Sequence, residues 1–477
     1  MNYSMIRYIT GWMLKLEAYF MLLPCLVALI YKERGGLAFF TVAIVCFVIG
    51  KLFTYKKPVN QTFFIREGFV VVTLSWIVLS VMGSIPFVLN GDIPNIINAI
   101  FETVSGFTTT GASILSDVEA ISKCSLMWRS FTHWIGGMGV FVFLLAVIPL
   151  SGGSNMYLMV AESPGPSVGK LVPKVKKTAM ILYAIYICMT LAEILFLLLG
   201  GMPIFDSLAT SFGTAGTGGF GIKNDSMGSY NDYIQWVVTI FMILFGVNFN
   251  VYYLGIAKKW KKALRCEEAR VYFGIILVSI VIIAFNIRPM FHSIFSTVQH
   301  AAFQVGSIIT TTGFSTVDFD MWPQLSKTIL VLLMFVGACA GSTGGGIKVS
   351  RCLIAFKSIK KALDSYVHPR NVKKIKLEGK PVSHEVVRSV NVFLVLYVVL
   401  FAASVLLLSI NEFDMITNFT AVAATINNIG PGLELVGPSK NFGSFSDLSK
   451  IVLTFDMLVG RLELFPVMLF FYPPTWK

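Results

Sequence analysis

Long apolar blocks separated by short polar segments dominate the chain. A helix needs about 20 apolar residues to cross a bilayer, and about ten blocks come close to that length. We therefore predict membrane-spanning helices near residues 9–30, 36–54, 68–90, 127–149, 179–200, 234–257, 271–287, 326–357, 387–410 and 448–471. The pattern indicates an all-α membrane protein with about ten transmembrane helices.

Four shorter blocks lie between pairs of these predicted spans. Each has about 14–20 residues of mixed polarity, which is too short to cross the bilayer and is typical of a re-entrant half-helix. A glycine-containing segment follows each of them, and then another long span begins. The half-helices are predicted near residues 93–109, 204–216, 291–311 and 414–427.

The glycine-containing segments recur with a nearly constant period. They read Phe107-Thr-Thr-Thr-Gly111-Ala-Ser113, Gly216-Thr-Gly-Gly219-Phe-Gly221, Ile309-Thr-Thr-Thr-Gly313-Phe-Ser315 and Ile426-Asn-Asn-Ile-Gly430-Pro-Gly432. Their central glycines are 108, 94 and 117 residues apart. The period predicts four repeats of span, half-helix and span with pseudo-fourfold symmetry. The expected units are a leading two-helix domain at 1–58, followed by repeats at 59–160, 161–262, 263–380 and 381–477.

Extended backbone at membrane depth is tolerated only where protein or a water-filled cavity surrounds it. Glycine lets the carbonyl groups of such backbone turn inward, and four segments around one axis form a ring of oxygen ligands for a dehydrated cation. The C-terminal ends of the half-helices add partial negative charge. The repeated segments therefore predict a cation pore.

Blander interpretations exist for these glycines. A single segment would more simply be a close-packing motif of the GxxxG kind, but four occurrences at one period favour the pore. Residues 216–221 match the dinucleotide-binding pattern GxGxxG, yet no strand precedes them. The glycines before Lys348 lack the Gly-Lys-Ser/Thr order of a phosphate-binding loop.

Composition and charge agree with a membrane protein. Of the 477 residues, 55% are hydrophobic and 13% are charged, whereas soluble domains have roughly a quarter charged residues. A large aqueous enzyme domain is thereby excluded. The net charge of +13 needs no nucleic acid, because the loops predicted on the cytoplasmic side, with the N-terminus inside, hold 25 of the 38 Lys and Arg residues. The scattered Cys and His residues form no zinc or catalytic metal motif.

Two features interrupt the predicted spans. Five glycines lie within residues 337–346, and a helix loses about 1 kcal/mol for each Gly in place of Ala. Arg461 lies inside the last span, where a charge is costly and usually functional. It either faces a cavity or forms an internal ion pair with Asp456 or Glu463, and the sequence leaves both alternatives open.

These motifs resemble the Trk/Ktr/HKT superfamily of potassium transporters, and the leading helix pair and the length point to its TrkH branch. The resemblance extends over nearly the whole chain. Besides the four glycine segments, it rests on Gly337-Ala-Cys-Ala-Gly-Ser-Thr-Gly-Gly-Gly-Ile-Lys348 and on Gly460-Arg-Leu-Glu463. It implies four covalently joined channel-like units around one pore, a homodimer, and a cytosolic nucleotide-binding regulatory subunit as partner.

The resemblance also implies the site residues. Potassium ions would be coordinated by the backbone carbonyls of Thr110, Gly111, Gly218, Gly219, Thr312, Gly313, Ile429 and Gly430. The second and fourth segments lack the Thr-Thr-Gly run, which leaves their register open. Glycine at all four centres goes with potassium preference in this family. The implied gate is an intramembrane loop with Gly337, Gly341, Gly344, Gly345, Gly346 and Lys348, together with Arg461.

The expected function is therefore potassium uptake across a bacterial cytoplasmic membrane, with potassium as the only expected ligand ion. A sodium or mixed-cation symporter is the alternative within transport. A membrane-embedded enzyme lacks a nucleophile-base set in this sequence. Topology alone accounts for basic residues in the cytoplasmic loops, but the segment 351–386 is longer than topology needs. With the resemblance added, we expect this segment and 258–270 to help dock the regulatory subunit and to contact membrane lipid.

Overall fold

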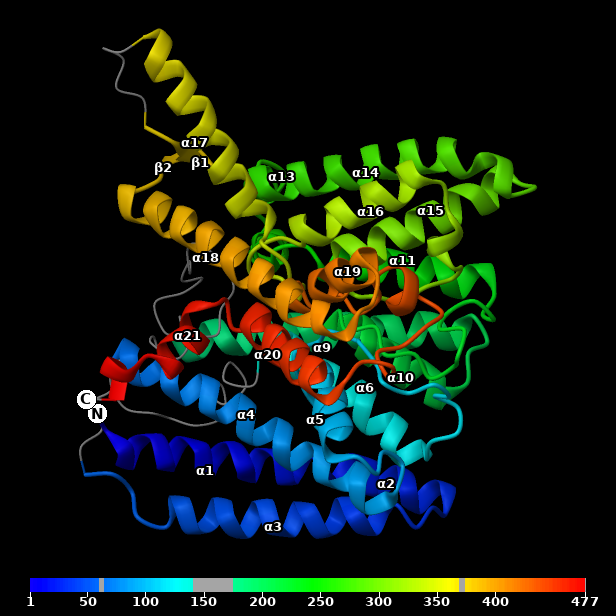
Figure 1. Cartoon of the computed structure of the whole chain (residues 1–477), viewed down its shortest axis with the longest axis vertical. Helices are drawn as coiled ribbons and strands as arrows, with labels where there is room; N and C mark the ends of the chain where they lie inside the picture. Colours follow the sequence, from blue (N-terminus) through cyan, green and yellow to red (C-terminus); the bar gives the residue numbers. More distant parts are fainter. Residues whose placement is uncertain (60–63, 140–174, 369–373, 477) are drawn as a thin grey trace.

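A computed structural model describes residues 1–59, 64–139, 175–368 and 374–476 (Figure 1). The described chain is mostly helical, and its strands are the short antiparallel pair β1 (Lys376–Leu377) and β2 (Lys380–Pro381). The second half of the predicted span 127–149 and the predicted unit boundary at 160 lie outside the described residues.

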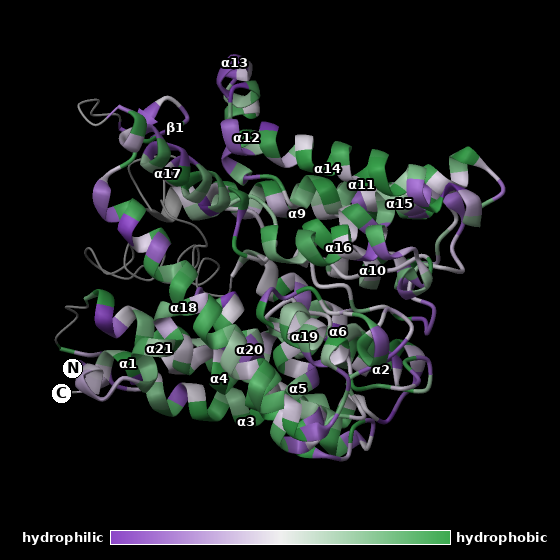
Figure 2. Cartoon of the chain, turned by 45° about the horizontal axis from the view of Figure 1, so that its top comes forward, coloured by the Kyte–Doolittle hydropathy of each residue, from purple (hydrophilic) through white to green (hydrophobic). Residues whose placement is uncertain are grey.

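Six helical segments of the described chain are long and apolar enough to cross a membrane. They are α1 (Tyr3–Phe20) with α2 (Leu22–Tyr31), α3 (Gly36–Thr54), α4 (Ile65–Asn90), α9 (Val175–Leu199), α14 (Glu267–Ile287) and α18 (His384–Leu408). These helices consist mostly of hydrophobic residues (Figure 2), and many of these residues are exposed. Leu29 and Phe285, for example, are each 80% exposed. Apolar surface of this extent is typical of a protein that lies in lipid.

Three predicted spans are broken in the structure. The span predicted at 234–257 consists of α11 (Asp232–Phe245) and α12 (Phe249–Ile256), which meet at 90°. The region predicted at 326–357 divides into α16 (Gln324–Val336), the glycine-rich segment, and α17 (Val349–Val367). The last span divides into α20 (Asp447–Arg461) and α21 (Phe465–Phe471), because Glu463 and Leu464 adopt positive φ angles of 62° and 63°.

Four short helices occupy the predicted half-helix positions. They are α5 (Ile96–Phe107), α10 (Ile204–Gly216), α15 (Ile294–Ile309) and α19 (Met415–Ile426). Polar side chains cap the first turn of three of them: the carboxylate of Asp414, for example, accepts a hydrogen bond from the Thr417 N–H at 2.8 Å. Each short helix packs against the long helix before it, namely α4, α9, α14 or α18.

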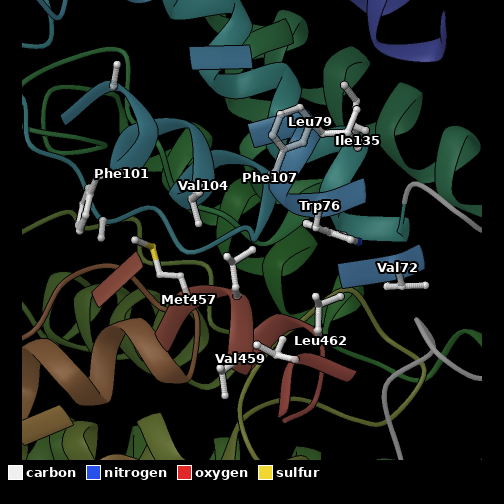
Figure 3. Close-up of a cluster of buried hydrophobic side chains, with 14 of the residues drawn as sticks. Val72, Trp76, Leu79, Phe101, Val104, Phe107, Ile135, Met457, Val459 and Leu462 are labelled. Atoms are coloured by element: carbon white, nitrogen blue, oxygen red, sulfur yellow. The ribbon is translucent and has the colours of Figure 1, made fainter. Parts of the chain in front are cut away.

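Contacts between the short helices and the helices around them close into a cycle. The helix after one half-helix packs against the next half-helix: α6 (Lys123–Met138) against α10, α11 against α15, and α16 against α19. In the same way α20 packs against α5, so the end of the chain returns to its beginning. Figure 3 shows this closing contact, where Trp76 of α4 and Phe107 of α5 share one buried cluster with Met457 of α20.

The leading helices α1 to α3 flank this cycle. α1 and α3 lie side by side, and both contact α4 (Figure 1). The leading helices therefore pack against the outside of α4, and the four short helices lie nearer the centre.

Candidate functional site

The four glycine-containing segments meet at the C-terminal ends of the short helices. Their central glycines, Gly111, Gly219, Gly313 and Gly430, line one cavity of about 120 Å³. The remaining walls of this cavity come from the loops that follow the segments and from Arg129 of α6. The structure thus brings together four segments that are far apart in the sequence.

All four segments share one backbone conformation. In each, the N–H group before the central glycine donates to the carbonyl five residues earlier, and all four distances are 2.8 Å. The donors are Thr110, Gly218, Thr312 and Ile429, and the acceptors are Ser105, Gly213, Ser307 and Ala424. Positive φ angles of 55–59° occur two residues before each central glycine, at Thr109, Thr217, Thr311 and Asn428. The second and fourth segments therefore have the same register as the other two, although they lack the Thr-Thr-Gly run.

The central glycines face carbonyl groups of the neighbouring segments in cyclic order. A Cβ atom on Gly111 would lie 1.9 Å from the Gly218 oxygen, and one on Gly219 would lie 1.9 Å from the Thr312 oxygen. The corresponding distances are 2.0 Å from Gly313 to the Ile429 oxygen and 2.8 Å from Gly430 to the Thr110 oxygen. All four glycines also have positive φ angles, between 77° and 99°. Close approach and backbone conformation both require glycine here.

We call these four segments the carbonyl ring. The described residues contain no group of three or more His, Cys, Asp or Glu side chains that could hold a metal ion. Oxygen ligands from the backbone are suited to a large monovalent cation, and the C-terminal ends of the four short helices supply partial negative charge at the same place.

Hydrogen bonds from buried side chains connect the segments of the ring to each other and to the surrounding helices. The Thr108 and Thr110 hydroxyls lie 2.8 Å apart, and the Asn428 amide donates to the Thr110 hydroxyl and to the Met457 carbonyl at 2.9 Å each. His133, which is fully buried, accepts at Nε2 from the Phe220 N–H at 3.2 Å. Its Nδ1 lies 2.8 Å from the Gly106 carbonyl, so the proton is on Nδ1.

A buried ion pair stabilises the loops after the first two segments. Arg129 of α6 and Glu102 of α5 are 2.8 Å apart, and their side chains are 2% and 0% exposed. Glu102 also accepts from the Ile114 N–H at 3.0 Å, and Arg129 donates to the Gly221 carbonyl at 3.3 Å. Sequence reasoning missed both this pair and His133. The available signal was a charged or imidazole side chain inside a predicted apolar helix.

The glycine-rich segment 337–348 is a loop that lies against the third and fourth segments of the ring. The Gly345 N–H donates to the Thr311 hydroxyl at 2.6 Å, and the Gly346 N–H donates to the Asn427 carbonyl at 3.1 Å. A Cβ atom on Gly344 would lie 2.8 Å from the Thr310 oxygen. Gly337, Gly341 and Gly346 have φ angles of 70–76°. The Lys348 ammonium donates to the Gly344 carbonyl within the loop.

Glu268 in α14 holds both ends of this loop. One of its carboxylate oxygens accepts from the Ala340 N–H at 2.7 Å and from the Ser350 N–H at 3.1 Å. The loop is also bonded to the break between α11 and α12. There the Cys339 N–H donates to the Gly246 carbonyl at 3.1 Å, and the Phe249 N–H donates to the Gly341 carbonyl at 3.0 Å. Sequence reasoning did not single out Glu268.

Arg461 connects the loop to α6. Its guanidinium donates to the Thr343 carbonyl at 2.8 Å, to the Gly137 carbonyl at 2.7 Å and to the Gly136 carbonyl. The alternative of an ion pair with Asp456 is wrong. Asp456 accepts from the Ser404 hydroxyl at 2.7 Å, and its second oxygen has no hydrogen-bond partner among the described residues. The carboxylate of Glu463 pairs with Arg351 of α17.

Carboxylates in the loops after the glycine-containing segments join neighbouring loops. Asp117 accepts from the Asn224 amide at 2.9 Å, and this hydrogen bond lowers the pKa of Asp117. Asp318 accepts from the Ser439 hydroxyl at 2.7 Å. The acidic residues therefore link the loop after the first glycine-containing segment to the loop after the second, and the loop after the third to the loop after the fourth.

Comparison with known proteins gives consistent results. A family model described as TrkH, cation transport protein, matches residues 35–475. The chain is 36% identical to the Trk system potassium uptake protein TrkH of Salmonella typhimurium over 487 residues, and 32% identical to that of Halomonas elongata over 489 residues. Both alignments cover all of each chain. The crystal structure of the potassium transporter TrkH from Vibrio parahaemolyticus matches with a TM-score of 0.90 and 33% identity, again over all of both chains.

Proposed function

The chain belongs to the TrkH family of cation transport proteins, and on that basis we propose that it takes up potassium across a bacterial cytoplasmic membrane. The members of this family are membrane transporters rather than enzymes. The observation that carries the proposal is the closed carbonyl ring, in which four segments with one backbone conformation face each other in cyclic order. Four units with pseudo-fourfold symmetry would surround one pore.

In this proposal the ring is a selectivity filter. The carbonyls of Thr110, Gly218, Thr312 and Ile429, with those of the central glycines, replace the hydration shell of a potassium ion. The hydrogen bonds behind the ring hold the four backbones at fixed separation, which favours one ion size over others. Acidic residues such as Asp117, which stays ionised at neutral pH, raise the local concentration of cations at the outer mouth.

The loop 337–348 is the proposed gate. It lies against Thr310, Thr311 and Asn427, directly beside the ring, and its glycines permit backbone conformations that other residues rarely adopt. A cytosolic nucleotide-binding regulatory subunit would move it by docking on the basic segments 258–270 and 351–386. The protein would act as a homodimer with its N-terminus in the cytoplasm.

Growth at low potassium tests the function. A bacterial strain without its own potassium uptake systems should grow when it expresses this protein, and proteoliposomes should accumulate a potassium tracer in preference to sodium. Equal uptake of both ions, or uptake that requires sodium, would instead identify a sodium or mixed-cation symporter. No uptake of either ion by well-folded protein would reject transport by the isolated chain.

Arg461→Gln tests the proposed gate. We expect the potassium flux to rise by roughly tenfold, because the variant removes charged hydrogen bonds that tie the loop to α6. Arg461→Lys is the matched variant, since it keeps the positive charge but cannot form the same fork of hydrogen bonds. If the potassium flux rises in both variants, the hydrogen bonds of Arg461 keep the gate closed. If the flux rises only in Arg461→Gln, the positive charge keeps it closed. Tracer flux per folded molecule that stays unchanged in both variants, with a lower Tm, would show that Arg461 is only structural.

A further inference from the structure

A second cavity lies away from the carbonyl ring, among α9, α11, α12, α13 (Trp260–Leu264) and α14. Its volume is about 760 Å³, within the range of ligand sites, and its walls are almost entirely apolar. Cys188 and Ala192 of α9 form one wall, and Tyr252 of α12 and Phe273 of α14 form others. Phe273 is 45% exposed, so the cavity opens on the apolar surface of the membrane-spanning helices.

A basic cluster borders one end of this cavity. It consists of six exposed side chains: Lys258, Lys259, Lys261, Lys262, Arg265 and Arg270. Arg270 and Trp260 line the cavity themselves. Within the described part of the chain, no carboxylate lies within 4.0 Å of any of these six cations. Figure 2 shows α13 next to α12, with hydrophilic residues along part of it.

We propose that this cavity binds one anionic phospholipid. An acyl chain fills the apolar cavity, and the phosphate of the headgroup lies against the basic cluster. Lys and Arg next to apolar membrane helices attract anionic lipid, and Trp260, which is 63% exposed, has the amphipathic ring typical of the level of the headgroups.

A second copy of the chain fits this surface less well. In a twofold dimer the same patch meets itself, so two basic clusters near the axis would repel each other. A cytosolic protein that docks on the cations would leave the apolar cavity unfilled, because the walls of the cavity lie on helices that face the bilayer. A phospholipid supplies both the negative charge and the apolar chain.

The cavity is also connected to the proposed gate. Its α12 wall begins at Phe249, whose N–H donates to Gly341 of the loop. A bound lipid would therefore stabilise the break between α11 and α12 to which the loop is bonded. This consequence rests on the proposed function, whereas lipid binding itself does not.

Native mass spectrometry of the full chain in detergent tests the proposal. The protein is titrated with phosphatidylglycerol or with phosphatidylcholine of the same acyl chains, and we expect one tight site for the anionic lipid. Lys261→Gln/Lys262→Gln should weaken phosphatidylglycerol binding by about 30-fold, since each cation near an anionic headgroup strengthens binding about fivefold. Lys56→Gln/Lys57→Gln, which removes two exposed lysines after α3, is the matched control and should change nothing.

Cys188→Trp tests the acyl-chain part of the site, because the exposed Cys188 lines the cavity and an indole ring there would fill it. We expect the tight site for phosphatidylglycerol to disappear, with the protein still folded. Equal phosphatidylglycerol binding in the two Lys-to-Gln variants would overturn the headgroup assignment. Loss of a dimer in Cys188→Trp, with lipid binding unchanged, would show that a second copy occupies the cavity instead. The mass of bound lipid does not depend on transport, so these results stand apart from the proposed function.

Discussion

Gly219→Ala should abolish potassium transport. The new Cβ would lie 1.9 Å from the Thr312 carbonyl oxygen, and the two backbones must move apart to accommodate it. A displacement of about 1 Å in a preorganised site can cost roughly 100-fold in rate, so we expect at least that loss in potassium flux. Tracer uptake into proteoliposomes, normalised to folded protein, measures it.

Gly91→Ala is the matched control for this change. Gly91 has the same φ angle of 77° as Gly219, but a Cβ atom there would have no neighbour within 4 Å. Both variants therefore carry the backbone strain, and only Gly219→Ala carries the steric clash. We expect Gly91→Ala to transport at nearly the normal rate. Normal flux and unchanged potassium preference in Gly219→Ala would show that the carbonyl ring is not the ion pathway.

Arg129→Met should cause the largest loss of stability. It leaves the Glu102 carboxylate buried without its cation, which typically costs about 3–5 kcal/mol. The double variant Arg129→Met/Glu102→Met removes both charges and should recover much of that loss. We expect the Tm measured by thermal unfolding in detergent to be lowest for the single variant, higher for the double variant and highest for the unchanged protein.

Lys327→Met provides the comparison for a partly exposed pair. Lys327 and Asp320 are 3.8 Å apart, and their side chains are 19% and 13% exposed, so we expect a loss of less than about 1 kcal/mol. If Arg129→Met were as stable as Lys327→Met, the ion pair of Glu102 and Arg129 would not stabilise the loops after the first two segments.

The short helices could be predicted from the sequence because their length and polarity set them apart. Their bounds in the structure lie within three residues of the predicted ones. The break at Glu463 and Leu464 could not be predicted, since neither residue favours a positive φ angle. The bend before α12 follows an apolar run in which Asn248 is the main polar residue, and its cap on the Asn250 N–H becomes visible only in the fold.

In the candidate site, too, some features could be predicted from the sequence and others could not. Glycines at one period predicted four similar backbone segments, because only glycine combines a positive φ angle with close approach. The supporting contacts join residues far apart in the sequence, as when Glu268 accepts from Ala340 and Ser350. The partners of Arg461 are backbone carbonyls, which have no signature in sequence, and so the ion pair with Asp456 was a reasonable but wrong alternative.

The hydrogen bond from Asn428 to Thr110 joins residues 318 positions apart. A ribosome that adds roughly 5–20 residues per second needs about 16–64 s to make the intervening chain. During this interval the first segment lacks its partner in the fourth segment. The ring cannot close before the fourth segment has been synthesised and inserted. A chain released early would therefore have no complete ring.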